Sequence, residues 1–343
     1  MRKLVLLLAQ LTAAVFLYAQ QKPHYTQYIL NNYILNPAIT GIENYTDIKL
    51  SYRNQWQGLN GAPQTFYASI QGPLGKKDYR TTPTSYNVPG ENPRGRSYWE
   101  EYTAAEPHHG FGAIFINDRT GFISRSSMFL TYAYHLGMNP NTSLAGGFMG
   151  GATLIHLDRT KIDWATLNPN DPAVGVAKGE LRKWQPELGA GLWLYSADYF
   201  AGISVQNIVP KKISFSSTGN YGNYLKPHFF ATLGYRFFLN DDINCLPSVT
   251  AKYVSPLKPQ YDVNIKFQYQ DLFWLGGSYR TSDQFGGWAA MAGLNVGNTF
   301  NISYAFDAAT SSKMKPVSYG SHEILLGFLV GNKYGDTCPG NVW

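Results

Sequence analysis

The dominant pattern along the chain is a strict alternation of apolar and polar residues. Between positions 261 and 270 every odd-numbered residue is apolar and every even-numbered residue is polar. Successive side chains of a β-strand point to opposite faces, so this segment predicts a strand with one apolar face and one polar face. Tyr261 and Tyr269 bound the apolar face, which is typical of strands that meet the two interfaces of a membrane.

Similar alternation predicts about fourteen strands, most of them near ten residues long. They lie near residues 45–55, 64–72, 109–118, 122–137, 142–156, 185–195, 198–209, 226–239, 243–254, 260–270, 272–281, 287–297, 299–308 and 319–331. Bacterial outer-membrane barrels have an even number of antiparallel strands, and only a closed sheet pairs every backbone group in hydrocarbon. We therefore expect an all-β transmembrane antiparallel barrel over residues 44–332, with a soluble all-β fold as the alternative.

The lengths of the connections give an independent indication of a barrel, since barrels have short periplasmic turns and longer extracellular loops. Short polar turns are predicted at 138–141, 196–198, 240–242, 270–271 and 297–298. The longer connections lie at 57–62, 157–184, 210–225, 282–286 and 309–318. The proline-rich segment 73–107 breaks this alternation, and we interpret it as an irregular insertion on the periplasmic side.

The two ends of the chain differ from the predicted barrel. Arg2 and Lys3 precede an apolar stretch over 4–17, and the small residue Ala19 follows. This is the pattern of a secretory signal peptide, so residues 1–19 are expected to be removed after Ala19. Residues 20–43, rich in Tyr, Asn and Gln, predict either a plug inside the barrel or a mobile periplasmic segment. Residues 333–343 are expected to form a C-terminal periplasmic tail.

Composition supports a membrane setting. Charged residues make up 15% of the chain, whereas soluble proteins average about 25%. A strand with one face in lipid excludes charge from half of its positions. The net charge of +6 is too small to indicate a nucleic-acid partner.

The charges that do occur fall mostly on faces expected to point inward. These residues are Lys49, Arg53, Arg236, Lys252 and Lys266, together with Asp47, Asp262 and Asp307. Buried charges need partners, so one interpretation is a charge-balanced and hydrogen-bonded interior. The other is a channel or a docking surface.

The sequence contains no pattern typical of catalysis or of a bound cofactor. His108 and His109 lack nearby ligands at metal-binding spacing, and we expect them at a solvated strand end. Glu100, Glu101 and Glu106 lie in the proline-rich segment. We expect no enzyme, no cofactor and no metal. The two cysteines, Cys245 and Cys338, could form a disulfide or remain separate thiols.

An ordered series of short motifs resembles the PorP/SprF family of Bacteroidetes, outer-membrane proteins of the type IX secretion system. The series reads Asn36-Pro37-Ala38 with Gly41, then Tyr52-Arg53-Asn54-Gln55-Trp56, Gly61-Ala62-Pro63 and Gly72-Pro73-Leu74. The resemblance makes six residues candidates for structure or partner contact: Asn36, Pro37, Tyr52, Arg53, Gln55 and Trp56. The intervening residues 75–107 depart from the family pattern.

The resemblance implies a non-enzymatic outer-membrane barrel that binds, helps to export or anchors a secreted surface protein, such as an adhesin or gliding-motility cargo. The implied partners are outer-membrane lipid, a cargo protein with a C-terminal sorting domain, and periplasmic or outer-membrane components of the secretion system. The alternatives are an outer-membrane porin or hydrophobic-solute channel, and a soluble extracellular lectin-like module.

Overall fold

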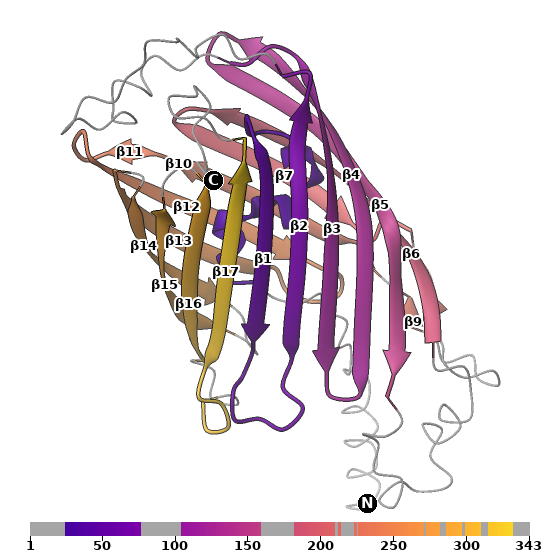
Figure 1. Cartoon of the computed structure of the whole chain (residues 1–343). Coiled ribbons are helices and arrows are strands. Elements are labelled where there is room, and N and C mark those ends of the chain that lie inside the picture. The colour runs from indigo at the N-terminus through magenta and orange to yellow at the C-terminus, as the bar shows by residue number, and fades with distance from the viewer. Residues whose placement is uncertain are drawn as a thin grey trace, which may run out of the picture.

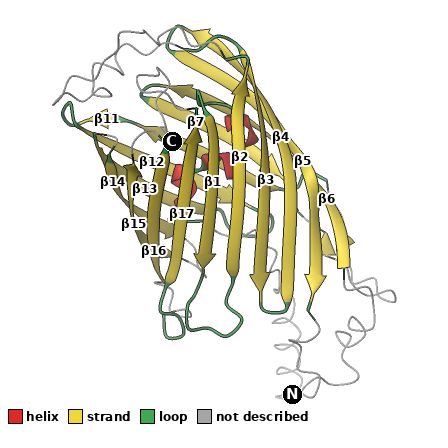
Figure 2. Cartoon of the chain, in the orientation of Figure 1, coloured by secondary structure: helices red, strands yellow, loops and turns green. Residues whose placement is uncertain are grey.

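Fourteen antiparallel strands close into a single barrel in the computed structural model, which confirms the predicted fold class (Figures 1 and 2). The structure describes residues 25–76, 104–158, 182–209, 212–213, 223–224, 226–270, 272–281, 286–296, 299–309 and 315–331. Within these residues there is no helix with the length and apolar character to cross a bilayer. The predicted signal peptide, the C-terminal tail and Cys338 lie outside the described residues.

All of the predicted strands are present, with ends shifted by a few residues. Their bounds are β1 (Thr46–Asn54), β2 (Gln64–Leu74), β3 (His108–Thr120), β4 (Ile123–Asn139), β5 (Thr142–Leu157), β6 (Arg182–Ser196), β7 (Tyr199–Gln206), β10 (His228–Tyr235), β11 (Phe237–Phe238), β12 (Ile243–Tyr253), β13 (Gln260–Tyr269), β14 (Phe273–Thr281), β15 (Gly287–Val296), β16 (Phe300–Ala309) and β17 (Ser321–Val330). Strands β10 and β11 are one strand interrupted at Arg236, since both pair with β12. Strands β8 (Lys212–Ile213) and β9 (Asn223–Tyr224) form a separate small pair.

Every barrel strand pairs with its neighbours in the chain, and β1 closes the ring against β17. That closing register runs from Thr46 opposite Val330 to Asn54 opposite His322. Closure removes the free sheet edges that would expose unpaired backbone groups to lipid.

The alternation on β13 has the expected orientation. Its outward residues Tyr261, Val263, Ile265 and Phe267 are exposed, whereas the intervening polar residues Asp262, Asn264, Lys266 and Gln268 are buried. The apolar face therefore meets the surroundings of the barrel, and the polar face meets its interior. This inverted arrangement is the one expected for a protein whose solvent is lipid.

Most connections sort by length between the two ends of the barrel, but the tight β3–β4 turn and the long β2–β3 connection each lie at the end that their length does not predict. The end that holds the β4–β5, β6–β7, β11–β12, β13–β14 and β15–β16 turns is here named the short-turn end. The opposite end holds the β1–β2, β5–β6, β7–β10 and β16–β17 connections and is named the long-loop end. Strand β2 ends and β3 begins at the short-turn end. The connection between them begins later than predicted, because β2 continues through Pro73 to Leu74, which is opposite His109.

Residues 25–43 lie inside the barrel, and every one of them is buried. We name this segment the plug. Three short 3-10 turns shape it: η2 (Gln27–Leu30), η3 (Asn32–Ile34) and η4 (Pro37–Ile39). The turns appear within the ring of strands in Figure 2. Plug residues Tyr33, Ala38 and Ile39 join wall residues Trp193 and Phe200 in one apolar cluster, so the plug is part of the core of the molecule.

Glycines on the inward face of the wall let the plug backbone come close. A Cβ added to Gly147 on β5 would lie 2.6 Å from the Pro37 carbonyl oxygen and 2.7 Å from the Ala38 Cα. Its neighbour Gly146 faces outward, where an added Cβ would first meet a side-chain methyl of Leu192 at 3.6 Å. The Gly147 position therefore has no room for a side chain, whereas the Gly146 position does.

We expect Gly147→Ala to push the plug away from β5 and to destabilise the folded barrel by roughly 1–3 kcal/mol, the usual cost of overpacking. The matched control Gly146→Ala is expected to leave stability nearly unchanged. Thermal unfolding in detergent and proteolysis of the plug would measure both effects. Equal stability of the two variants would show that the plug does not bear on this part of the wall.

Candidate functional site

Asn36 fastens the middle of the plug to two wall strands. It lies immediately before η4, where its Oδ1 accepts a hydrogen bond from the Ala38 N–H at 3.0 Å. Its Nδ2 donates to the backbone oxygens of Leu192 on β6, at 3.0 Å, and Ile203 on β7, at 3.2 Å. Pro37 fits the first position of the turn because its missing N–H needs no partner there. One amide side chain thus caps a plug turn and bridges the plug to the wall.

Arg53 makes the second attachment, near the long-loop end. It points inward from β1 and pairs with Asp307 on β16 and with Glu323 on β17, the latter at 2.9 Å. Arg53 Nη1 also donates to the hydroxyl of plug residue Thr26 at 2.6 Å. Thr26 in turn donates its hydroxyl to Asp307 at 2.6 Å and its backbone N–H to Glu323 at 2.8 Å. We name these four residues the Arg53 cluster.

A second group of ion pairs extends the same polar wall. Asp262 on β13 accepts from Lys252 Nζ at 2.6 Å and from Arg280 Nε at 3.3 Å. Lys252 Nζ also lies 4.6 Å from the centroid of the ring of plug residue Tyr28, a cation–π distance. Burial raises the pKa of the Tyr28 phenol, so this group stays neutral beside the charges. The N-terminal half of the plug therefore contacts wall side chains whose charges are paired with one another.

The other end of the plug is held by two stacked histidines. The rings of His108 on β3 and His135 on β4 are parallel, with centroids 4.5 Å apart. Their Nε2 atoms lie within hydrogen-bond distance of the plug carbonyls of Gly41, at 3.2 Å, and Thr40, at 2.8 Å. The expectation of a solvated His108 is wrong, because the plug covers this ring. His109 faces outward and contacts the Tyr132 hydroxyl at 2.8 Å.

The other sequence candidates do not join the plug. Tyr52 faces outward on β1. Gln55 is buried after β1 and donates its backbone N–H to Pro63 at 2.9 Å. Trp56 has a positive φ of 54° and donates its backbone N–H to Ser321 Oγ at 3.1 Å, which shapes the turn at the long-loop end. The motif series thus combines plug contacts with a turn and a lipid-facing side chain.

Cys245 lies on the outward side of β12, opposite Phe237 and Phe267. Its possible partner Cys338 is outside the described residues, so the disulfide stays a prediction. Across the described ranges, no cluster of three or more His, Cys, Asp or Glu residues is arranged to hold a metal ion.

The wall charges expected to face inward do so and are buried or nearly buried. Lys49 pairs with Asp47, and Asp262 and Asp307 pair as described above. Arg236 is buried where β10 and β11 are interrupted. Of the two interpretations, these pairs support a charge-balanced and hydrogen-bonded interior.

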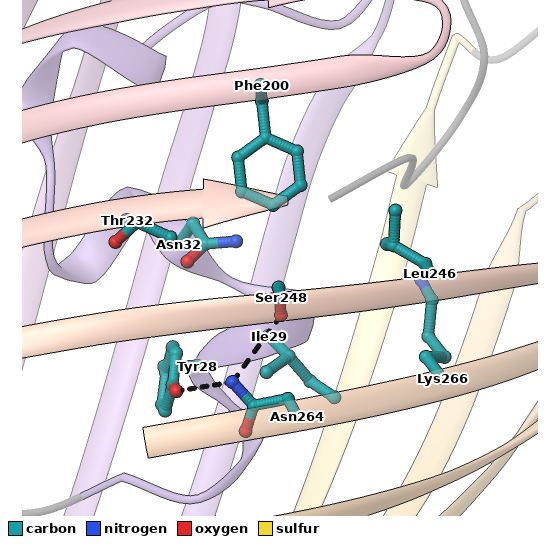
Figure 3. A pocket seen from close by; sticks show the side chains of 9 residues that line it. All are labelled: Tyr28, Ile29, Asn32, Phe200, Thr232, Leu246, Ser248, Asn264 and Lys266. Atoms are coloured by element: carbon teal, nitrogen blue, oxygen red, sulfur yellow. Dashed lines mark hydrogen bonds between the residues drawn. The ribbon is translucent and has the colours of Figure 1, made fainter. Parts of the chain in front are cut away.

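Small cavities remain between the plug and the wall. One is lined by Tyr28, Ile29, Asn32, Phe200, Thr232, Leu246, Ser248, Asn264 and Lys266 (Figure 3). Within it Asn264 Nδ2 donates to the Tyr28 hydroxyl at 2.7 Å and to Ser248 Oγ at 3.4 Å. Another borders Lys266 together with Lys49 and Gln268. The hydrogen bond between Asn264 and Tyr28 is thus a further attachment of the plug to the wall.

Sequence reasoning missed several residues of this site. Glu323 is the one carboxylate of β17, and its position directly before the apolar run from Ile324 to Val330 was a usable signal. His135 could have been found on the inward face of β4. Thr26 carries no signal of its own, because a single threonine in a polar segment predicts no ion-pair partner.

The closed barrel with an apolar exterior, an ion-paired interior and a filled lumen defines the class: an outer-membrane β-barrel. The family model for the type IX secretion system membrane protein PorP/SprF matches residues 17–328, and the chain belongs to this family. The motif resemblance is thereby confirmed.

Two solved structures illustrate barrels similar to this chain. The outer membrane protein Omp33 of Acinetobacter baumannii is 7% identical, covers 84% of this chain and 100% of its own, and has a TM-score of 0.46. The toluene transporter TbuX of Ralstonia pickettii is 10% identical, covers 86% of this chain and 92% of its own, and also has a TM-score of 0.46. No curated protein matches the chain significantly.

We expect Arg53→Met to destabilise the barrel by about 3–5 kcal/mol, because it leaves two buried carboxylates without their cation. Adding Asp307→Asn and Glu323→Gln to the same chain should restore much of this loss, since neutral amides need no counter-charge. Denaturant unfolding of the barrel in lipid vesicles measures both. If Arg53→Met alone were as stable as the wild type, the Arg53 cluster would not contribute to the stability of the fold.

Proposed function

We propose that this barrel binds a secreted surface protein, such as an adhesin or gliding-motility cargo, and helps to export it or anchors it at the outer membrane. The observation that carries the proposal is the filled lumen. The plug is buried along its whole length and is fastened near both ends and in the middle. A lumen occupied in this way favours work at the rims of the barrel over conduction through it.

The long-loop end offers an ordered surface for such contact. The β1–β2 and β16–β17 connections lie side by side in Figure 1. Gln57 donates its backbone N–H to Gly320 at 2.8 Å, and Tyr319 donates to Gln57 at 2.8 Å. On this paired projection the side chains of Leu59, Val317 and Tyr319 are exposed, with Tyr319 82% accessible. Exposed apolar and aromatic side chains on a held backbone are typical of protein-contact sites.

The two ends of the chain would serve the same function from the periplasmic side. Cleavage after Ala19 would release the mature chain, and the tail 333–343 would follow β17 on the periplasmic side. Periplasmic components of the secretion system would then meet the short-turn end of the barrel.

We expect a strain without this gene to lose surface display of its cargo, and the double variant Leu59→Ser with Tyr319→Ala to reduce display several-fold. Surface immunolabelling of the cargo measures both. Lys258→Ala, in the β12–β13 loop at the same end, is the matched control and is expected to keep display. Normal display in the deletion strain would refute the proposed function.

The plug also separates this function from that of a porin. The purified wild-type barrel in planar bilayers is expected to show no steady conductance, while deletion of residues 25–43 is expected to open an ion path. Folding of both proteins is checked by their heat-dependent mobility in gels. Steady conductance of the wild-type barrel would favour the solute-channel alternative.

A further inference from the structure

The outward face of β4 changes from apolar to polar toward the long-loop end. Its outward residues are apolar or aromatic from Met138 to Met128, and Ser126 and Ser124 follow. At about 3.3 Å per residue and a strand tilt of about 40°, the apolar part has a height of roughly 25 Å. This is the height of the lipid-facing band of an outer-membrane barrel, so Ser126 and Ser124 lie at the headgroup level.

The same change occurs on β3 and β5, which flank β4, and on β6, which pairs with β5. On β3, Phe115 is followed by Asn117 and Arg119. On β5, Leu154 is followed by His156. On β6, the change falls between Trp184 and Arg182.

The strand register joins the polar ends into one continuous row. Arg119 lies opposite Ser124, Ser124 opposite His156, and His156 opposite Arg182. The row behind it contains Trp184, which is 66% accessible, and Asn117, whose Nδ2 donates to Ser126 Oγ at 2.7 Å. A basic row, an aromatic and amide row and an apolar band therefore follow one another on this part of the wall.

On the outward faces of the described strand residues, arginine and lysine side chains occur in this row alone. Among the described residues of the barrel strands, Arg119 and Arg182 are the arginine or lysine side chains that face outward, and both are exposed. No acidic side chain of those strand residues faces outward, because the carboxylates of the wall point into the lumen. His156 faces outward between Ser124 and Arg182, and its Nδ1 is buried without a hydrogen-bond partner among the described residues.

We propose that the outward row formed by Arg119, Ser124, His156 and Arg182 binds a phosphate-bearing glycolipid of the outer leaflet. Guanidinium groups bind phosphate through paired hydrogen bonds, and hydroxyl and imidazole groups suit a sugar headgroup. Trp184 lies at the level where aromatic rings bridge headgroups and acyl chains, and the apolar rows below it would hold those chains. Outer-membrane barrels have their longer loops on the extracellular side, so the long-loop end faces the outside, where the outer leaflet lies.

The test uses the full-length barrel in detergent and lipid A bisphosphate as the probe, with binding measured by native mass spectrometry. The double variant Arg119→Gln with Arg182→Gln is expected to bind roughly tenfold more weakly than the wild type, as expected when charged hydrogen bonds to phosphate are lost. Dephosphorylated lipid A is expected to bind wild type as weakly as bisphosphate binds the variant. Retained heat-dependent gel mobility ensures that the variant is folded.

The matched control removes two positive charges from loops at the same end, as Lys258→Ala with Lys315→Ala, and is expected to bind like the wild type. Equal loss in this control would replace a specific site with general charge attraction and overturn the proposal. Unchanged binding by the arginine variant would also overturn it, as would competition by millimolar inorganic phosphate alone. These readouts involve no cargo, so they are independent of the proposed secretion role.

Discussion

The interior of this barrel depends on the pairing of charges that the strand alternation turns away from lipid. Each strand buries every second side chain in the lumen, and on β1, β12, β13, β14, β16 and β17 some of those side chains form ion pairs. A buried charge without a partner is costly, so these groups must find one another or a polar segment that enters the lumen. The Arg53 cluster does both, because Thr26 of the plug bonds to all three of its ionised side chains.

The attached plug limits the size of the side chains that the facing wall positions can carry. Where a plug side chain donates to wall carbonyls, as the Asn36 amide does with Leu192 on β6 and Ile203 on β7, the facing wall positions cannot carry bulky side chains. Gly191 faces Asn36 and Gly147 faces the Asn36-Pro37-Ala38 turn, so the glycine-rich composition reflects close packing of plug against wall. At the short-turn end the stacked pair His108 and His135 closes the same interface. The plug and the wall are therefore one folded unit.

The sequence was sufficient for the strands because each strand is a local pattern. Period-two alternation places side chains on two faces regardless of the rest of the chain, so the inward charges could be assigned along with the strand positions. The contacts of the plug were not predictable, because they depend on which wall residue each plug residue meets across long separations in the chain. His108 illustrates this limit: its neighbours in sequence indicate a solvated strand end, whereas Thr40, Gly41 and His135 bury it.

The same division of side chains between the two faces of each strand also determines the character of the outer surface. Because the alternation turns the ionised strand residues inward, a charge that faces outward takes no part in the ion pairs of the interior. It must be stabilised by water, by a headgroup or by another protein. The described outer surface departs from apolar uniformity at the rims of the barrel and in outward polar rows. The paired projection of Leu59 and Tyr319 and the row from Arg119 to Arg182 are two such departures, and both lie at the long-loop end. Contacts with protein and with lipid headgroups would then share one side of the membrane and adjoin one another, because the Gly121 N–H beside the row donates to the Gly61 oxygen in the β1–β2 connection at 2.9 Å.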